Sequence, residues 1–247
     1  MKNLKTYSMF ESVMELTPEQ VQWLDDCTKG TWTLNPQTGL VDVKGDFDCH
    51  EQGLTDFKGV KFGEVGSSFY CSSNALTSLM GAPLKVGYYF YCNRNDLTSL
   101  VGAPLKVGSD FACNNNALTS LEGAPQRMGG SFYCKNNQLT SLVGAPREVG
   151  GSFACNNNAL TSLEGAPREV SGSFDCDINP VSRETLKKIF AKMQKNTSYL
   201  AAVESLWSKI PQDDQVLLYG DDFKWVTPEQ SRGLVALRSY QDLRGML

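Results

Sequence analysis

Apolar side chains recur with a fixed period through the middle of the chain. Seven Phe–x–Cys segments are followed in most copies by Asn, by Leu-Thr-Ser-Leu and then by Gly-Ala-Pro. Their cysteines are separated once by 22 residues and after that always by 21. A period of this length predicts a solenoid in which each copy is one coil. The phenylalanines of the seven predicted coils are Phe47, Phe69, Phe90, Phe111, Phe132, Phe153 and Phe174.

The residues of one copy predict how a coil is built. Phe and Cys are two residues apart, so in a strand both side chains point into the coil. The Asn three residues after each Cys has an amide that can satisfy backbone groups where the strand turns. Gly and Pro disfavour a helix on the return path. We therefore expect residues 40–181 to form one parallel strand per 21-residue coil, with an extended or polyproline-like return path and no helix.

Helix and hairpin signals flank the repeats. Thr17-Pro18-Glu19-Gln20 predicts a helix start, with Thr17 as the N-cap and Gln20 reaching back to it. Residues 31–34 and 40–43 predict a hairpin around Asn35-Pro36, so we expect residues 1–39 to be an N-terminal cap. Residues 182–247 predict helices that begin at Ser182, near residue 199 and at Thr227. This C-terminal region is expected to be a helical cap or a small helical domain.

The repeat resembles the leucine-rich repeat. Phe–x–Cys–x–x–Asn–x–Leu fits the pattern L-x-x-L-x-L-x-x-N-x-L, and the Leu-Thr-Ser-Leu and proline are similar to the short repeats of bacterial effector-type proteins. The resemblance covers about residues 40–181 and implies a solenoid with a concave sheet and a non-helical convex side. It does not imply a particular ligand, because the family binds many different things. Separately, the opening MKNLKTYSMFES resembles the leaders of proteins from large tailed bacteriophages.

Composition and charge narrow the classes of function. The net charge is −4, which argues against a surface for nucleic acid or an anionic membrane. There is no signal-peptide pattern and no apolar stretch as long as a membrane span, so we expect a soluble cytoplasmic protein, in the host cytoplasm if it is phage-encoded. The eight cysteines include no C-x-x-C pair, which favours buried, reduced thiols over metal ligands or disulfides. We expect no metal and no cofactor.

The sequence does not predict an enzyme. It has a single histidine, His50, and no recognisable Ser/His/Asp set or phosphate loop. Effector proteins with similar repeats often carry a C-terminal ubiquitin-ligase domain with a catalytic cysteine, but here no cysteine follows Cys176 and the tail is too short. We therefore predict no catalytic residues, although an undetected activity in the tail stays a third alternative.

Departures from the common repeat indicate a binding surface. The residues before each Phe and between Phe and Cys are expected to face outward on the concave sheet, where most coils have Gly-Ser and several have Ala. The third coil instead reads Tyr88-Tyr89-Phe90-Tyr91, and Tyr and Arg are enriched at binding hot spots. Aspartates at positions 46, 48, 110 and 175 line the same sheet. The predicted partner-binding residues are Tyr70, Tyr88, Tyr89, Tyr91, Arg94, Asp110, Tyr133 and Lys135.

These features favour a protein-binding module that captures a partner protein on its concave face. If the bacteriophage resemblance holds, the partner is expected to be a bacterial host protein, such as part of an antiviral defence. The alternative from another class is a virion or surface adhesin, in which Tyr and Asp side chains would stack on a sugar and hydrogen-bond to it.

Overall fold

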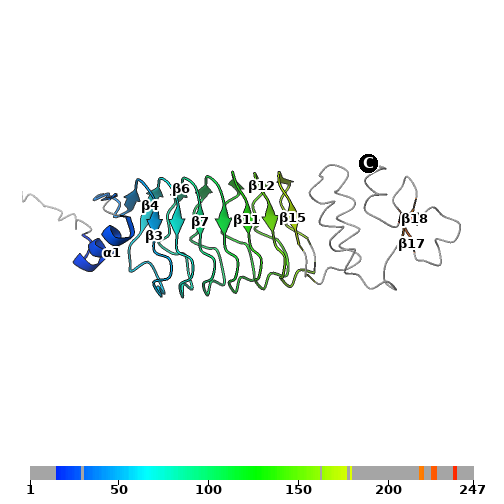
Figure 1. The fold of residues 1–247 in the computed structure, drawn as a ribbon, viewed down its shortest axis with the longest axis horizontal. Helices are drawn as coiled ribbons and strands as arrows, with labels where there is room; N and C mark the ends of the chain where they lie inside the picture. The colour runs from blue at the N-terminus through cyan, green and yellow to red at the C-terminus, as the bar shows by residue number, and fades with distance from the viewer. Residues whose placement is uncertain are drawn as a thin grey trace, which may run out of the picture.

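The repeats form a β-solenoid in the computed structural model, and Figure 1 shows its coils stacked along a nearly straight line. The structure describes residues 15–28, 31–161, 163–176 and 179, and the backbone of three further short strands given below. Strands of successive coils pair in parallel, with Phe90 opposite both Phe69 and Phe111. Between Asp46 and Cys176 no described residue is in a helix. The predicted parallel solenoid with a non-helical return path is confirmed.

One sheet, which we call sheet B, contains the seven Phe–x–Cys segments. Its order is β15-β13-β11-β9-β7-β5-β3, so neighbouring strands in the sheet belong to consecutive coils. The strands are β3 (Phe47–Asp48), β5 (Phe69–Tyr70), β7 (Phe90–Tyr91), β9 (Phe111–Ala112), β11 (Phe132–Tyr133), β13 (Phe153–Ala154) and β15 (Phe174–Asp175).

A second sheet, sheet A, corrects the expectation of one strand per coil. Its order is β1-β2-β4-β6-β8-β10-β12-β14, and each of the later strands lies on the return path just after the buried proline. In β6, Lys85 is exposed and Val86 is buried, so the segment alternates as a strand does. Its backbone pairs in register with the equivalent residues of the next coil. The strands are β1 (Trp32–Leu34), β2 (Val41–Val43), β4 (Phe62–Val65), β6 (Lys85–Val86), β8 (Lys106–Val107), β10 (Arg127–Met128), β12 (Glu148–Val149) and β14 (Glu169–Val170).

The core is a set of identical side chains stacked from coil to coil. The rings of consecutive sheet-B phenylalanines are 5.1–5.7 Å apart, and most of these pairs are nearly parallel. Beside them lie the cysteines and leucines of each repeat, which are also buried. All eight cysteines are buried, as predicted. Burial raises the pKa of the thiols from Cys49 to Cys155 above the ordinary value.

The repeated asparagines bind the backbone at the end of each sheet-B strand, as predicted. In Asn95 the side-chain oxygen accepts a hydrogen bond from the Leu76 N–H at 3.0 Å. The Asn95 amide donates to the carbonyl groups of Cys71 (3.0 Å) and Cys92 (3.1 Å). Each of these carbonyls also accepts from the asparagine of a neighbouring coil. The asparagine ladder therefore ties every coil to the one before it.

Replacing Asn95 by Ala should lower the free energy of unfolding by roughly 2–4 kcal/mol. The two carbonyls keep one partner each, but the buried Leu76 N–H loses its acceptor, and an unsatisfied buried donor alone costs about 1–3 kcal/mol. Asn93→Ala is the matched control, because its half-buried side chain makes none of the hydrogen bonds found in the described residues. Urea unfolding of both variants measures the difference. Equal losses in the two variants would contradict the role given to the ladder.

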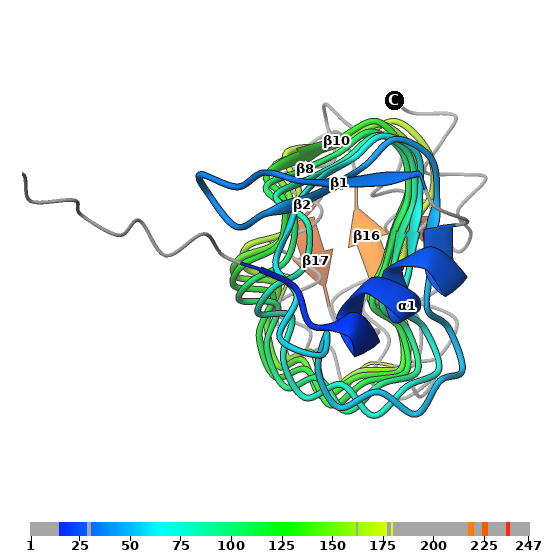
Figure 2. The ribbon, with the colours of Figure 1, turned by 90° about the vertical axis from the view of Figure 1, so that its left-hand side faces the viewer.

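A short helix and a hairpin cover the N-terminal end of the stack (Figure 2). Helix α1 (Pro18–Thr28) begins with the predicted cap: the Thr17 N–H donates to Gln20 Oε1 at 2.8 Å, and the Gln20 N–H donates to Thr17 Oγ1 at 3.2 Å. Strands β1 and β2 form the predicted antiparallel hairpin.

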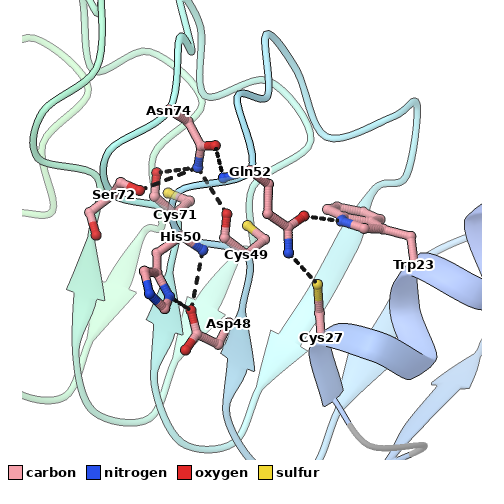
Figure 3. A network of polar contacts seen from close by, with 9 residues as sticks. All are labelled: Trp23, Cys27, Asp48, Cys49, His50, Gln52, Cys71, Ser72 and Asn74. Carbon is pink, nitrogen blue, oxygen red and sulfur yellow. Dashed lines mark hydrogen bonds and ion pairs between the residues drawn. The ribbon is translucent and has the colours of Figure 1, made fainter.

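Trp23 joins helix α1 to the first coil. Its ring lies 5.2 Å from that of Phe47, and its indole N–H donates to Gln52 Oε1 at 2.8 Å. The amide of Gln52 also contacts Cys27 Sγ at 3.5 Å, so one polar side chain bridges both α1 residues (Figure 3). The helix thus covers the apolar end of the phenylalanine stack, which would otherwise face water.

The C-terminal region contains three short strands that the sequence did not predict. Strand β16 (Leu217–Tyr219) pairs antiparallel with β17 (Lys224–Val226) and β18 (Ala236–Leu237). Ala236 and Leu237 lie within the third predicted helix, and the rest of that helix lies outside the described residues. The predicted helices from Ser182 and near residue 199 lie outside the described residues. Among the helices that the structure describes, none is long and apolar enough to cross a membrane.

Candidate binding surface

The outward side of sheet B presents two rows of side chains, one on each side of the buried phenylalanines. The row before Phe contains Ser68, which is buried, and then Tyr89, Asp110 and Ser131, which are partly exposed, in consecutive coils. The row after Phe reads Asp48, Tyr70, Tyr91, Ala112, Tyr133, Ala154 and Asp175, and the strand register places these residues side by side. Because the stack is nearly straight, we call this surface the outward face of sheet B rather than a concave face.

Four of the predicted residues form one cluster of aromatic rings. The Tyr89 and Tyr91 rings are 5.5 Å apart, with 30° between their planes. Tyr91 also meets Tyr70 of the preceding coil edge-on at 5.6 Å, and Tyr88 meets Tyr89 at 6.3 Å. Tyr88 is 58% exposed, and the other three rings are half-buried. We call Tyr70, Tyr88, Tyr89 and Tyr91 the tyrosine cluster.

The environment of Tyr91 differs from that of an exposed tyrosine. Partial burial, the nearby Asp110 carboxylate and the neighbouring phenols raise the pKa of Tyr91 to about 12. Its hydroxyl therefore stays protonated throughout the physiological range and is available as a hydrogen-bond donor. The cluster combines apolar ring area with a polar group at its edge, as binding hot spots commonly do.

The other predicted residues surround this cluster at different distances. Asp110 is in the next coil, opposite Tyr89 in the register that pairs Phe90 with Phe111. Arg94 is exposed at the corner that follows the same strand as Tyr91, in a left-handed backbone conformation with a φ of 55°. Tyr133 and Lys135 lie two coils beyond Tyr91, and among the described residues no ring contact joins Tyr133 to the cluster.

The sheet begins with a contact between a histidine and a carboxylate at its N-terminal edge. Asp48 lies beside Tyr70 in register, and its carboxylate contacts His50 Nδ1 (Figure 3). The hydrogen bond from His50 to Asp48 raises the pKa of His50. Both side chains are about half exposed, so this pair contributes little to stability.

Exposed apolar side chains adjoin the tyrosines along the chain, and the sequence reasoning missed them. Met80, Leu84, Val101 and Leu105 are 52–78% exposed and occupy the same two repeat positions in consecutive coils. We call these four residues the corner patch. The signal was present in the repeats, because the same positions in the later coils carry mostly polar side chains: Glu122, Gln126, Arg147, Glu164 and Arg168, with Val143 as the exception. Exposed apolar residues gathered in this way are typical of interaction surfaces.

The outward side of sheet A has a different character. Lys85 pairs with Glu64 at 2.9 Å and Arg127 pairs with Glu148 at 3.1 Å, each across neighbouring coils. Exposed ion pairs of this kind are common on solvated surfaces and are worth little energy. In the described part of the chain, no three His, Cys, Asp or Glu side chains come together as metal ligands. The outward face of sheet B is therefore the stronger candidate for a binding surface.

The fold defines a β-solenoid repeat protein with about 21 residues per coil. Comparisons with protein-family models, with curated proteins and with solved structures give no match. The leucine-rich-repeat and bacteriophage resemblances therefore stay predictions from the sequence.

Proposed function

We propose that this protein is a binding module that captures a partner protein on the outward face of sheet B, with the tyrosine cluster at the centre of the contact. The observation that carries the proposal is the gathering of four partly exposed tyrosines in two coils of an otherwise uniform repeat. The corner patch belongs to the same coils, next to the start of the sheet-A strands β6 and β8. Arg94 and Asp110 give this surface a polar rim, which is typical of protein interfaces.

The partner is proposed to be a bacterial protein. The support for this is the resemblance of the first twelve residues to bacteriophage leaders, which makes a bacterial lysate the appropriate source of partners. In this proposal the protein binds a host protein, such as a component of antiviral defence, and has no catalytic role of its own.

The repeat itself provides the variant that tests the proposal. Tyr88→Gly, Tyr89→Ser and Tyr91→Ala together convert the third coil to the Gly-Ser-Phe-Ala sequence that residues 151–154 already have. This cluster variant should lose the partner that the wild-type protein captures from a bacterial lysate, because losing a hot spot costs about 2 kcal/mol or more. Identification of the captured proteins by mass spectrometry measures the result.

Arg127→Gln with Glu148→Gln is the matched control, since it removes an exposed ion pair on sheet A without changing the net charge. The control variant should capture the partner as well as the wild type does. The proposal is wrong if the cluster variant retains the same partner, or if the tyrosines are needed only for binding to a glycan array.

A further inference from the structure

The tyrosine cluster has a carboxylate fixed at its edge. Asp110 is opposite Tyr89 in the parallel register, and adjacent strands lie about 4.8 Å apart. In the row after Phe on the same face, Ala112 is opposite Tyr91 and contributes only a methyl group. Asp110 is therefore the neighbour of Tyr89 in the sheet, and its carboxylate is near enough for its charge to raise the pKa of Tyr91.

Asp110 is held in this position by the following coil. Its Oδ1 accepts a hydrogen bond from the backbone N–H of Ser131 at 2.7 Å. A Cβ at position 130 would lie 2.1 Å from the same oxygen, so Gly130 leaves the room that this contact needs. No other hydrogen bond to the carboxylate and no ion pair of Asp110 is found in the described residues, which leaves Oδ2 available.

Among the described residues, no cationic side chain forms a cation–π contact with these rings or an ion pair with this carboxylate. The one cation–π contact among the described residues joins Lys58 to Trp23, at the far end of the first coil. Arg94, the nearest arginine in sequence, forms no ion pair in the described part of the chain. Tyrosine faces attract cations, and a neighbouring carboxylate strengthens that attraction when both are partly removed from water.

We propose that Tyr89, Tyr91 and Asp110 form a site for a cationic side chain of the partner protein, an arginine or a lysine. The rings supply the face on which the cation stacks, and Asp110 Oδ2 accepts its hydrogen bond. The inference rests on the proposed function only in naming a protein as the source of the cation. The net charge of −4 also favours a partner segment that is positively charged.

Asp110→Asn provides a close test of this site. An asparagine keeps an oxygen to accept from the Ser131 N–H but removes the charge, so the variant should fold and melt like the wild type. The probe is N-acetylarginine amide, and its neutral isostere N-acetylcitrulline amide is the control at the same ionic strength. NMR signals of the Tyr89 and Tyr91 rings should shift in a saturable way with the arginine probe only. Asp110→Asn should weaken that binding roughly tenfold or more.

Three results would overturn the inference: no saturable shift with the arginine probe, equal shifts with the citrulline probe, or unchanged binding in Asp110→Asn. The failure of the inference can be told from the failure of the proposed function. A captured partner that needs the tyrosines but binds Asp110→Asn as tightly as the wild type would overturn the cation site and leave the proposed function in place.

Discussion

Raising the pH to 9.5 should remove most of the free energy of unfolding. Burial raises the pKa of six stacked thiols, from Cys49 to Cys155, so the folded chain keeps their protons. In the unfolded chain a thiol has a pKa of about 8.5 and loses its proton above that value. The stabilisation is thus complete below about pH 8.5 and is lost as the pH rises further.

The expected loss is large because the same group recurs in every coil. One pH unit above the unfolded pKa, each thiol costs about 1.4 kcal/mol, and six thiols cost roughly 8 kcal/mol. A whole domain has a net stability of about 5–15 kcal/mol. Urea unfolding under reducing conditions, repeated at several values between pH 7.5 and 9.5, measures this loss.

A variant with fewer thiols isolates their contribution. Cys113→Ala with Cys134→Ala lowers the stability at every pH, because both side chains are buried. Its stability should nevertheless fall less steeply above pH 9, by about 2.7 kcal/mol per pH unit, since two groups no longer titrate. A slope identical to that of the wild type, or a wild-type stability that is constant over this range, would refute the explanation.

Gly108→Ala should be among the most destabilising single substitutions, with a loss of about 3 kcal/mol or more. Gly108 follows β8 at a corner where consecutive coils approach closely. A Cβ there would lie 1.9 Å from the carbonyl oxygen of Gly87, and that oxygen belongs to the backbone and cannot rotate away. Gly129 and Gly150 have the same contact with the coil before them. The equivalent position of the last described coil carries Ser171, so a Cβ can be accommodated there, but between Gly87 and Gly108 the backbone must shift to make room for the added methyl group.

Gly45→Ala is the matched control for this substitution. A Cβ at Gly45 meets only Thr31 Oγ1 at 3.8 Å, an ordinary van der Waals distance. We expect this variant to unfold within about 0.5 kcal/mol of the wild type. Thermal unfolding measures the stability of both variants. If Gly108→Ala is as stable as the wild type, the coils are spaced more widely than described.

Much of the fold could be predicted because each repeat has the same spacing of buried apolar residues, asparagine, glycine and proline. The two-residue spacing of Phe90 and Cys92 places both inside, and Asn95 is required where the strand ends. The second sheet was missed for a physical reason. A segment such as Lys85–Val86 is too short to be recognised as a strand, and it becomes one only when the coils stack and its backbone pairs in register.

The residues of the candidate site could be predicted from the sequence, but the contacts between their side chains could not. The triplet around Phe90 departs from the plain repeat, which identified Tyr88, Tyr89 and Tyr91. The contact of Tyr91 with Tyr70 depends on which side chains the register places together, and so does the position of Asp110. Neither follows from the sequence of one coil. The sequence also could not show that Tyr91 is half-buried, which depends on its neighbours in the coils on each side.

The central claim is that the tyrosine cluster binds the partner protein, and one pair of measurements on one variant tests it most directly. The dissociation constant of the captured partner and the melting temperature should be measured for the wild type and for the variant with Tyr88→Gly, Tyr89→Ser and Tyr91→Ala. We expect the dissociation constant of the variant to be at least tenfold higher than that of the wild type, because the lost hot spot costs about 2 kcal/mol or more. The loss of ring contacts should lower the melting temperature by several degrees, while the protein stays folded at the temperature of the binding assay. An unchanged dissociation constant in a folded variant would contradict the account and place the binding site elsewhere on the protein.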